Sequence, residues 1–106
     1  MGIKNTEVKG LIYAKELENF LHTFERSDFH FRKIVNNKAI NQIKEFCIDL
    51  EKQSKRIGAE SMLRFSDAIS LIFIYDKLDM LEIYPGKYHI ELRKLISEIK
   101  TYLHKK

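Results

Sequence analysis

The sequence predicts an all-α protein, specifically an antiparallel four-helix bundle with an additional short helix near the N-terminus. Three observations support this fold class. Apolar residues recur at helical spacing along four long segments, and no segment alternates polar and apolar residues as a strand would. The breakers Gly58 and Pro85–Gly86 separate the later segments by short connections. With 106 residues, of which 44% are hydrophobic, the chain is long enough for one core.

The first part of the chain predicts a lead-in, a long helix and a short helix. Residues 1–10 are polar with two glycines, so we expect a flexible lead-in before a single domain at 11–106. A long amphipathic helix is expected from Leu11, and a short one follows it. Ser27 or Asp28 is the expected cap of the short helix, and Asn37 that of the next one. The apolar positions of these two helices are Tyr13, Ala14, Leu17, Phe20, Leu21 and Phe24, then Phe29, Phe31, Ile34 and Val35.

The stretch 38–59 is expected to hold the central helix around which the rest of the chain is organised. Gly58 is suited to end it, because glycine enters the left-handed region without strain. Ile48 lies roughly 150° from the centre of the apolar stripe and is surrounded by charged residues, so we expect it to be exposed. The stripe itself consists of Ile40, Ile43, Phe46, Cys47, Leu50 and Ile57, with Ser54 completing the row.

The last third of the chain predicts two more helices. The sequence LIFIY at 71–75 is apolar nearly all round, which indicates burial among neighbouring helices or a subunit contact such as a homodimer. We expect a charged connection at 76–80 and extended or irregular chain at 81–84. The final helix is then expected from about Lys87. The inward residues are Met62, Phe65, Ile69, Ile72 and Phe73, then Tyr88, Leu92, Leu95, Ile96, Ile99 and Leu103.

The helix order and the Ile57-Gly58-Ala59 turn resemble the histidine phosphotransfer (HPt) domains of two-component phosphorelays. In that family the helix before such a turn carries a His-x-x-Lys-Gly pattern. The resemblance covers roughly residues 11–103. Aligned on the turn, Ile48 stands at the phosphoacceptor histidine, Glu51 at the lysine and Lys52 at the glycine. The resemblance therefore implies a degenerate member without phosphotransfer chemistry, which is not an enzyme.

The resemblance also implies a class of partner. A receiver domain, or a kinase or cyclase module of a two-component system, would dock on the central helix. The expected partner-binding residues are Ile48, Glu51, Lys52, Lys55 and Lys44. An apolar residue amid charges suits a docking anchor. Single exposed isoleucines are also common on protein surfaces and have no role there, so both interpretations stay open.

Other chemistry has little support in the sequence. His89, which opens the last helix off its apolar stripe, is the alternative phosphoacceptor, although an ordinary surface histidine is the simpler interpretation. No two histidines are spaced as a helical metal pair, and we expect no metal and no cofactor. Cys47 is the only cysteine and is expected to be a small buried hydrophobe.

Charge and hydropathy restrict the remaining classes. The net charge of +4 and the lysines on the outer face of residues 38–59 leave weak nucleic-acid binding as an alternative. Acidic residues interrupt that face and no aromatic side chain is interleaved, so a solvated mixed-charge surface is favoured. The apolar run at 69–75 is too short to span a bilayer, and the first ten residues do not resemble a signal peptide. We therefore expect a cytoplasmic protein without a membrane partner.

Overall fold

Helices make up nearly the whole chain. The computed structural model describes the backbone of residues 3–104 and the side chains of residues 13–104. No strand occurs in this part of the chain, so the all-α class is confirmed. The elements in order are α1 (Ile3–Phe24), α2 (Ser27–Asn36), α3 (Ile40–Ile57), α4 (Glu60–Ile74), the 3₁₀ helix η1 (Leu78–Ile83) and α5 (Tyr84–His104).

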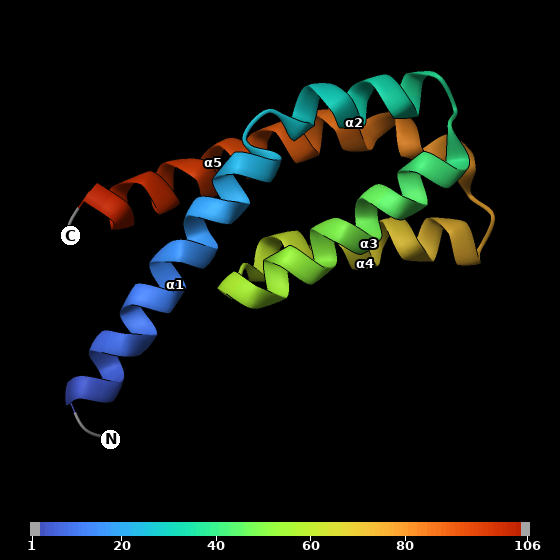
Figure 1. The fold of residues 1–106 in the computed structure, drawn as a ribbon. Helices are drawn as coiled ribbons and strands as arrows, with labels where there is room; N and C mark the ends of the chain where they lie inside the picture. Colours follow the sequence, from blue (N-terminus) through green and yellow to red (C-terminus); the bar gives the residue numbers. More distant parts are fainter. Residues whose placement is uncertain (1–2, 105–106) are drawn as a thin grey trace.

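The helices form an elongated body of 50 × 23 × 17 Å. The tight turn after α3 folds α4 back along it, and these two helices make the most extensive contact in the structure. Helix α2 packs along the first part of α5 and closes the opposite side of the core (Figure 1). Helix α1 reaches α3 and α5 through its C-terminal part, while its N-terminal part points away from the other helices.

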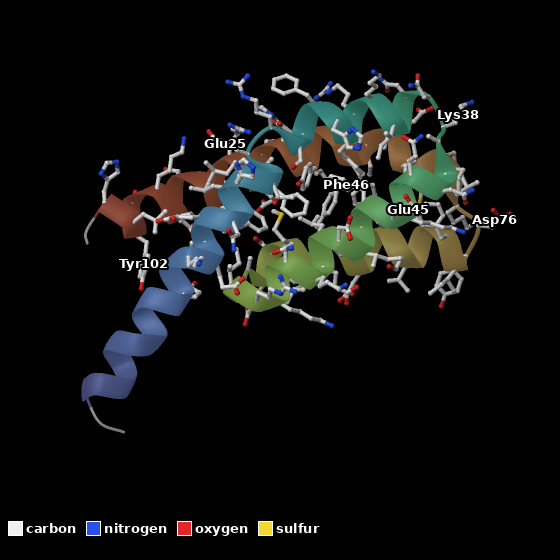
Figure 2. All side chains as sticks on the ribbon, in the orientation of Figure 1. Glu25, Lys38, Glu45, Phe46, Asp76 and Tyr102 are labelled. Atoms are coloured by element: carbon white, nitrogen blue, oxygen red, sulfur yellow. The ribbon has the colours of Figure 1, made fainter. Side chains whose placement is uncertain are left out.

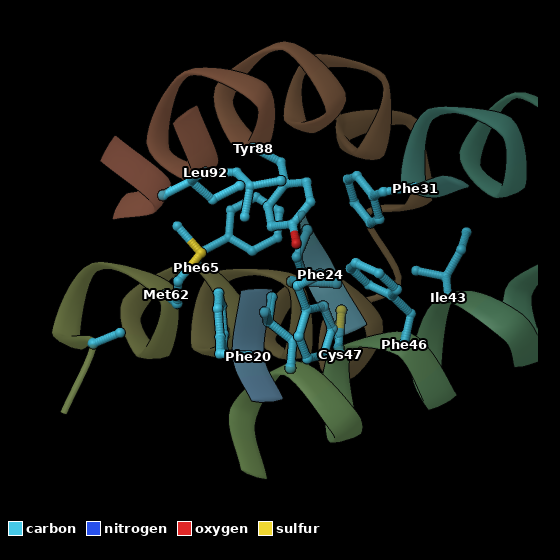
Figure 3. Close-up of a cluster of buried hydrophobic side chains, with 14 of the residues drawn as sticks. Phe20, Phe24, Phe31, Ile43, Phe46, Cys47, Met62, Phe65, Tyr88 and Leu92 are labelled. Carbon is cyan, nitrogen blue, oxygen red and sulfur yellow. The ribbon is translucent and has the colours of Figure 1, made fainter. Parts of the chain in front are cut away.

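An aromatic cluster joins four helices at the centre of the body (Figure 3). The Phe31 ring of α2 lies 5.2 Å from that of Phe46 on α3 and 5.3 Å from that of Tyr88 on α5. The Phe65 ring of α4 lies 5.0 Å from Tyr88. Such pairs contribute about 0.5–1.5 kcal/mol each beyond the burial of their surface. The cluster therefore fixes how α2 and α5 sit over the α3–α4 pair.

The fully buried Tyr88 also has a partner for its hydroxyl group. The Ser27 hydroxyl donates to the Phe24 carbonyl over 2.7 Å, and the Tyr88 hydroxyl lies 2.7 Å from the same Ser27 oxygen. Because Ser27 has one hydrogen to donate, Tyr88 is the donor in the second bond. These two bonds satisfy the buried polar groups where α1 turns into α2.

Helices α2, α3 and α4 end in the same way. Gly58 has φ 70°, which confirms the predicted end of α3, and Ala59 N–H donates to the Ser54 carbonyl over 2.9 Å. Lys38 and Asp76, both with φ 55°, occupy the equivalent positions after α2 and α4. The left-handed residue and its successor bond back to the last turn in each case, which is the Schellman motif.

Several predicted helix boundaries are wrong. Helix α1 begins at Ile3 rather than Leu11, while the flexibility expected for residues 1–10 stays a prediction. Neither Ser27 nor Asp28 caps α2, because both side chains are used in contacts with α5. Asn37 is not the cap of α3, which begins at Ile40 after the left-handed Lys38.

The connection predicted at 76–84 is also wrong in its second half. Residues 78–83 form η1, and α5 starts at Tyr84 instead of Lys87. Leu81 is buried in the core, which holds this segment against the body. Pro85 lies in the first turn of α5, where a helix N–H has no partner to lose, so proline begins this helix instead of breaking it.

Candidate functional site

The predicted docking residues border a shallow groove between α3 and α4. The Schellman turn at Gly58 returns α4 along α3, so the last turns of α4 lie beside the first half of α3. The space between them is about 230 Å³. We call it the α3–α4 groove; its lining residues are Lys44, Cys47, Ile48, Glu51, Ile69, Ser70, Phe73 and Ile74.

Two of the residues that line this groove are exposed isoleucines, one from each helix. The exposed fraction is 59% for Ile48 and 71% for Ile74. Ile48 is thus exposed, as the helical periodicity predicts. Leu71 and Tyr75 are also exposed; Leu71 lies three residues before Ile74 and four before Tyr75, so it neighbours both on the helix surface. An apolar surface therefore continues from α3 across the end of α4.

The burial expected for the LIFIY segment is only partly right. Ile72 is buried and Phe73 packs against the core, whereas Leu71, Ile74 and Tyr75 are exposed. The alternative of a subunit contact stays a prediction. The proximity of Ile74 to Ile48 does not follow from the sequence, since it depends on the register of two helices joined by a turn.

Charged groups at the groove are already engaged with their neighbours. The Lys44 ammonium lies 5.2 Å from the centre of the Phe73 ring, and Lys55 Nζ lies 3.3 Å from Glu51 Oε1. Of the five predicted contact residues, Lys44, Ile48 and Glu51 line the groove, while Lys52 and Lys55 are exposed beside it. Since Lys55 pairs with Glu51, the surface has an apolar centre and a mixed-charge border.

Cys47 is buried beneath this surface with an exposed fraction of 6%. Burial raises the pKa of its thiol to about 12, and the negative charge of Glu51 acts in the same direction. The thiol is therefore neutral at physiological pH, which is the opposite of a reactive cysteine. The expectation of a small buried hydrophobe is confirmed.

His89 takes part in a polar link between α2 and α5. Its Nδ1 atom lies 2.6 Å from Asp28 Oδ2, and Arg93 Nη2 lies 3.4 Å from Asp28 Oδ1. The Asp28 carboxylate is 3% exposed and the His89 side chain is 49% exposed. Because a carboxylate accepts hydrogen bonds, Nδ1 is the donor, and Nε2 has no partner among the described residues.

Sequence reasoning missed the role of Asp28. Asp28 and His89 are 61 positions apart in the sequence, and Asp28 has the features of an ordinary helix cap. Its position in the first turn of α2 is favourable for a negative charge. Only the packing of α2 against α5 brings the carboxylate to His89, and no local pattern in the sequence indicates that contact.

The other histidines do not converge on a site. His22 and His30 are exposed at the rim of an open groove of about 1000 Å³ between α1, α2 and α3. The His30 ring also lies 5.9 Å from that of Phe46. Within residues 13–104 no group of three or more His, Cys, Asp or Glu side chains is arranged to hold a metal ion.

Comparison of the chain with protein-family models, with curated proteins and with solved structures returns no match. In the described part of the chain, no helix has the combination of length and apolar character that crossing a membrane requires. Inferences about function therefore depend on the α3–α4 groove, on the Asp28–His89 link and on the resemblance carried by the turn at 57–59.

Proposed function

We propose that this chain is a signalling interaction module that docks a partner protein on the α3–α4 groove and performs no phosphotransfer there. The observation that carries the proposal is the exposure of Ile48 and Ile74 on either side of an apolar groove. Complete burial of one such side chain stabilises a complex by about 1.5–3 kcal/mol. Two adjacent anchors of this kind suit the centre of a protein–protein contact.

The class of partner follows from the resemblance to HPt domains. Under this proposal the helices correspond to an HPt-like antiparallel four-helix bundle, with α2 as the additional short helix. The partner is then a receiver domain, or a kinase or cyclase module of a two-component system. It approaches the face on which Ile48 replaces the phosphoacceptor histidine. Glu51, paired with Lys55, supplies an anion where the family has a cation for phosphate.

Nucleic-acid binding receives no such support. The basic residues of α3 are mixed with carboxylates, and Lys55 is paired with one of them. Continuous phosphate contact requires several unpaired cations along one surface.

Purified receiver domains carrying radioactive phosphate test the proposal. We expect saturable binding of at least one receiver to the chain, with the radioactivity remaining on the receiver. Failure of every receiver, kinase and cyclase module of the same genome to bind would contradict the docking role. Appearance of phosphate on the chain would instead favour a second candidate function, described next.

The second candidate is phosphotransfer at His89. The hydrogen bond from its Nδ1 to the buried Asp28 fixes the ring, the side chain is half exposed, and Nε2 has no partner among the described residues. In this reaction Nε2 forms a bond to phosphorus, and the bond from phosphorus to the receiver's aspartyl oxygen breaks. The aspartate leaves as a carboxylate. Arg93, four residues after His89 on α5 and 3.4 Å from Asp28, is the cation that would offset the added phosphate charge.

His89→Ala and His22→Ala distinguish this candidate from general background phosphorylation. Acid-labile phosphate that is lost in His89→Ala and retained in His22→Ala would establish His89 as the acceptor. Equal labelling of the two variants would exclude it. His22 is a suitable control because it is an exposed histidine without a carboxylate partner among the described residues.

A further inference from the structure

A second groove, separate from the α3–α4 groove, lies between the α2–α3 turn and η1. Its volume is about 700 Å³, and two of its lining residues, Val35 and Leu81, are buried. We call it the η1 groove. One wall consists of Val35, Asn36, Lys38 and Ile40, and the other of Leu78, Asp79, Leu81 and Glu82.

Both walls are held by helix ends with unusual backbone conformation. Lys38 precedes α3 and Asp76 precedes η1, and each has φ 55° (Figure 2 labels both at one end of the body). A left-handed lysine is strained, because its Cβ lies close to the following carbonyl oxygen. Such residues persist where the surrounding structure fixes them, as the Schellman hydrogen bonds and buried Leu81 do here. The groove is therefore preformed.

The η1 segment presents apolar side chains that the core does not use. Leu78, Met80 and Ile83 are exposed, although Leu81 between them is buried. Methionine adapts its shape to different partners because its side chain is unbranched and flexible. Of these side chains Leu78 lines the groove, so this wall offers an apolar contact to side chains from outside, while Met80 and Ile83 extend the apolar surface of η1 beyond the lining.

The charges on this wall indicate what the occupant carries. Asp79 and Glu82 line the groove on the η1 side, and Asp76 precedes η1 in the chain; none of the three has an ion-pair partner among residues 13–104. Lys38 is the single cation in the lining. These free carboxylates occur in a chain whose net charge is +4, so the acidic wall differs from the average surface.

We propose that the η1 groove binds a basic amphipathic helix of a partner protein. Apolar side chains at i, i+3 and i+4 would enter between Ile40 and Leu78, and lysine or arginine side chains would meet Asp79 and Glu82. The charge complementarity selects this occupant over an acidic or a purely apolar one. The proposal is independent of the docking role of the α3–α4 groove.

A fluorescein-labelled 18-residue peptide of leucine and lysine, with leucine at helical spacing, is the probe. We expect saturable binding by fluorescence anisotropy, and at least tenfold weaker binding when glutamate replaces the lysines. The double variant Asp79→Lys/Glu82→Lys should lose at least tenfold in affinity for the lysine peptide. The control Asp67→Lys/Glu98→Lys makes the same charge change at exposed acids elsewhere and should lose less than threefold.

Three results would overturn the proposal. Equal losses in the two double variants would mean that the peptide responds only to net charge. Loss of binding in Ile48→Asp would place the peptide in the α3–α4 groove. Unchanged binding in Leu78→Ser would remove the apolar wall from the contact, since Leu78 is a lining residue that is not part of the buried core. Circular dichroism of each variant verifies that the helices are intact.

Discussion

The ammonium group of Lys44 lies 5.2 Å from the centre of the Phe73 ring, and this contact joins the first half of α3 to the last turns of α4. Cation–π pairs at such exposed sites contribute about 0.5–1 kcal/mol. The contact lies in the same groove as Ile48 and Ile74. It therefore helps to hold the two exposed isoleucines in a fixed relation, which favours docking of a preformed surface.

Replacement of Ile48 by Asp should leave the fold intact. Because Ile48 is mostly exposed, we expect the free energy of unfolding to fall by only about 0.5 kcal/mol. Ile69→Asp, at a fully buried position on the adjacent helix, should cost more than about 3 kcal/mol. Urea denaturation followed by circular dichroism measures both. Comparable losses in the two variants would show that Ile48 is part of the core.

Introducing glycine at one left-handed turn position and removing it from another should have opposite effects on stability. Lys38→Gly should raise the free energy of unfolding by about 1 kcal/mol, since it removes the Cβ strain at φ 55°. Gly58→Ala should lower it by about 1–2 kcal/mol, although no atom would lie within 4 Å of the added Cβ. Thermal and urea denaturation test the pair. Destabilisation by Lys38→Gly would mean that the Lys38 side chain contributes more than its backbone strain costs.

Because the Cys47 thiol is buried, we expect the protein to lose stability in alkali. Its pKa is 9.0 when exposed and is raised to about 12 in the folded chain, mainly by burial. Folding thus favours the protonated thiol. That contribution is complete below pH 9 and is lost as the pH rises towards 12. Between pH 8 and 10 we expect Cys47 to account for about 1 kcal/mol of lost stability.

Cys47→Ala isolates this contribution from other groups that titrate in alkali, including Tyr88, whose pKa is raised by burial. The free energy of unfolding of the variant should fall less between pH 8 and 10 than that of the parent chain. Identical pH profiles would show that the thiol is not buried as described. A slow reaction of the folded parent with a thiol reagent would be a second indication of burial.

Asp28 should stabilise the contact between α2 and α5. Asp28→Asn weakens the charge-assisted bonds to His89 and Arg93, so we expect the free energy of unfolding to fall by about 1–3 kcal/mol. Asp67→Asn is the matched control, at an exposed aspartate without a partner among the described residues, and should change stability by less than about 0.5 kcal/mol. Equal effects in chemical denaturation would make the Asp28 link unimportant.

Periodicity and turn chemistry predicted much of the fold. The apolar stripe of α3, the exposure of Ile48 and the end of the helix at Gly58 all follow from local rules that the structure obeys. The predicted start of α5 at about Lys87 is wrong because proline both ends and begins helices, and only its neighbours decide which. Lys38 and Asp76 adopt the left-handed backbone conformation, which their residue types do not predict.

The candidate site was predictable only from one side. The α3 half follows from the residues that surround Ile48 on one helix. The α4 half depends on the position of α4 along α3 after the turn at Gly58. Tertiary packing decides that position, and the local sequence does not. The Asp28–His89 bond is the clearest case, because it joins residues that are 61 positions apart. No spacing rule within a helix relates such residues.

The affinity of a receiver domain for the parent chain, for Ile48→Asp and for Ile90→Asp tests the central claim most directly. Ile90 is a matched control, since it is 55% exposed and lies on α5, outside the α3–α4 groove. We predict that the dissociation constant is at least tenfold larger for Ile48→Asp than for the parent chain and unchanged for Ile90→Asp. Equal affinities of all three chains would show that the α3–α4 groove is not the docking site.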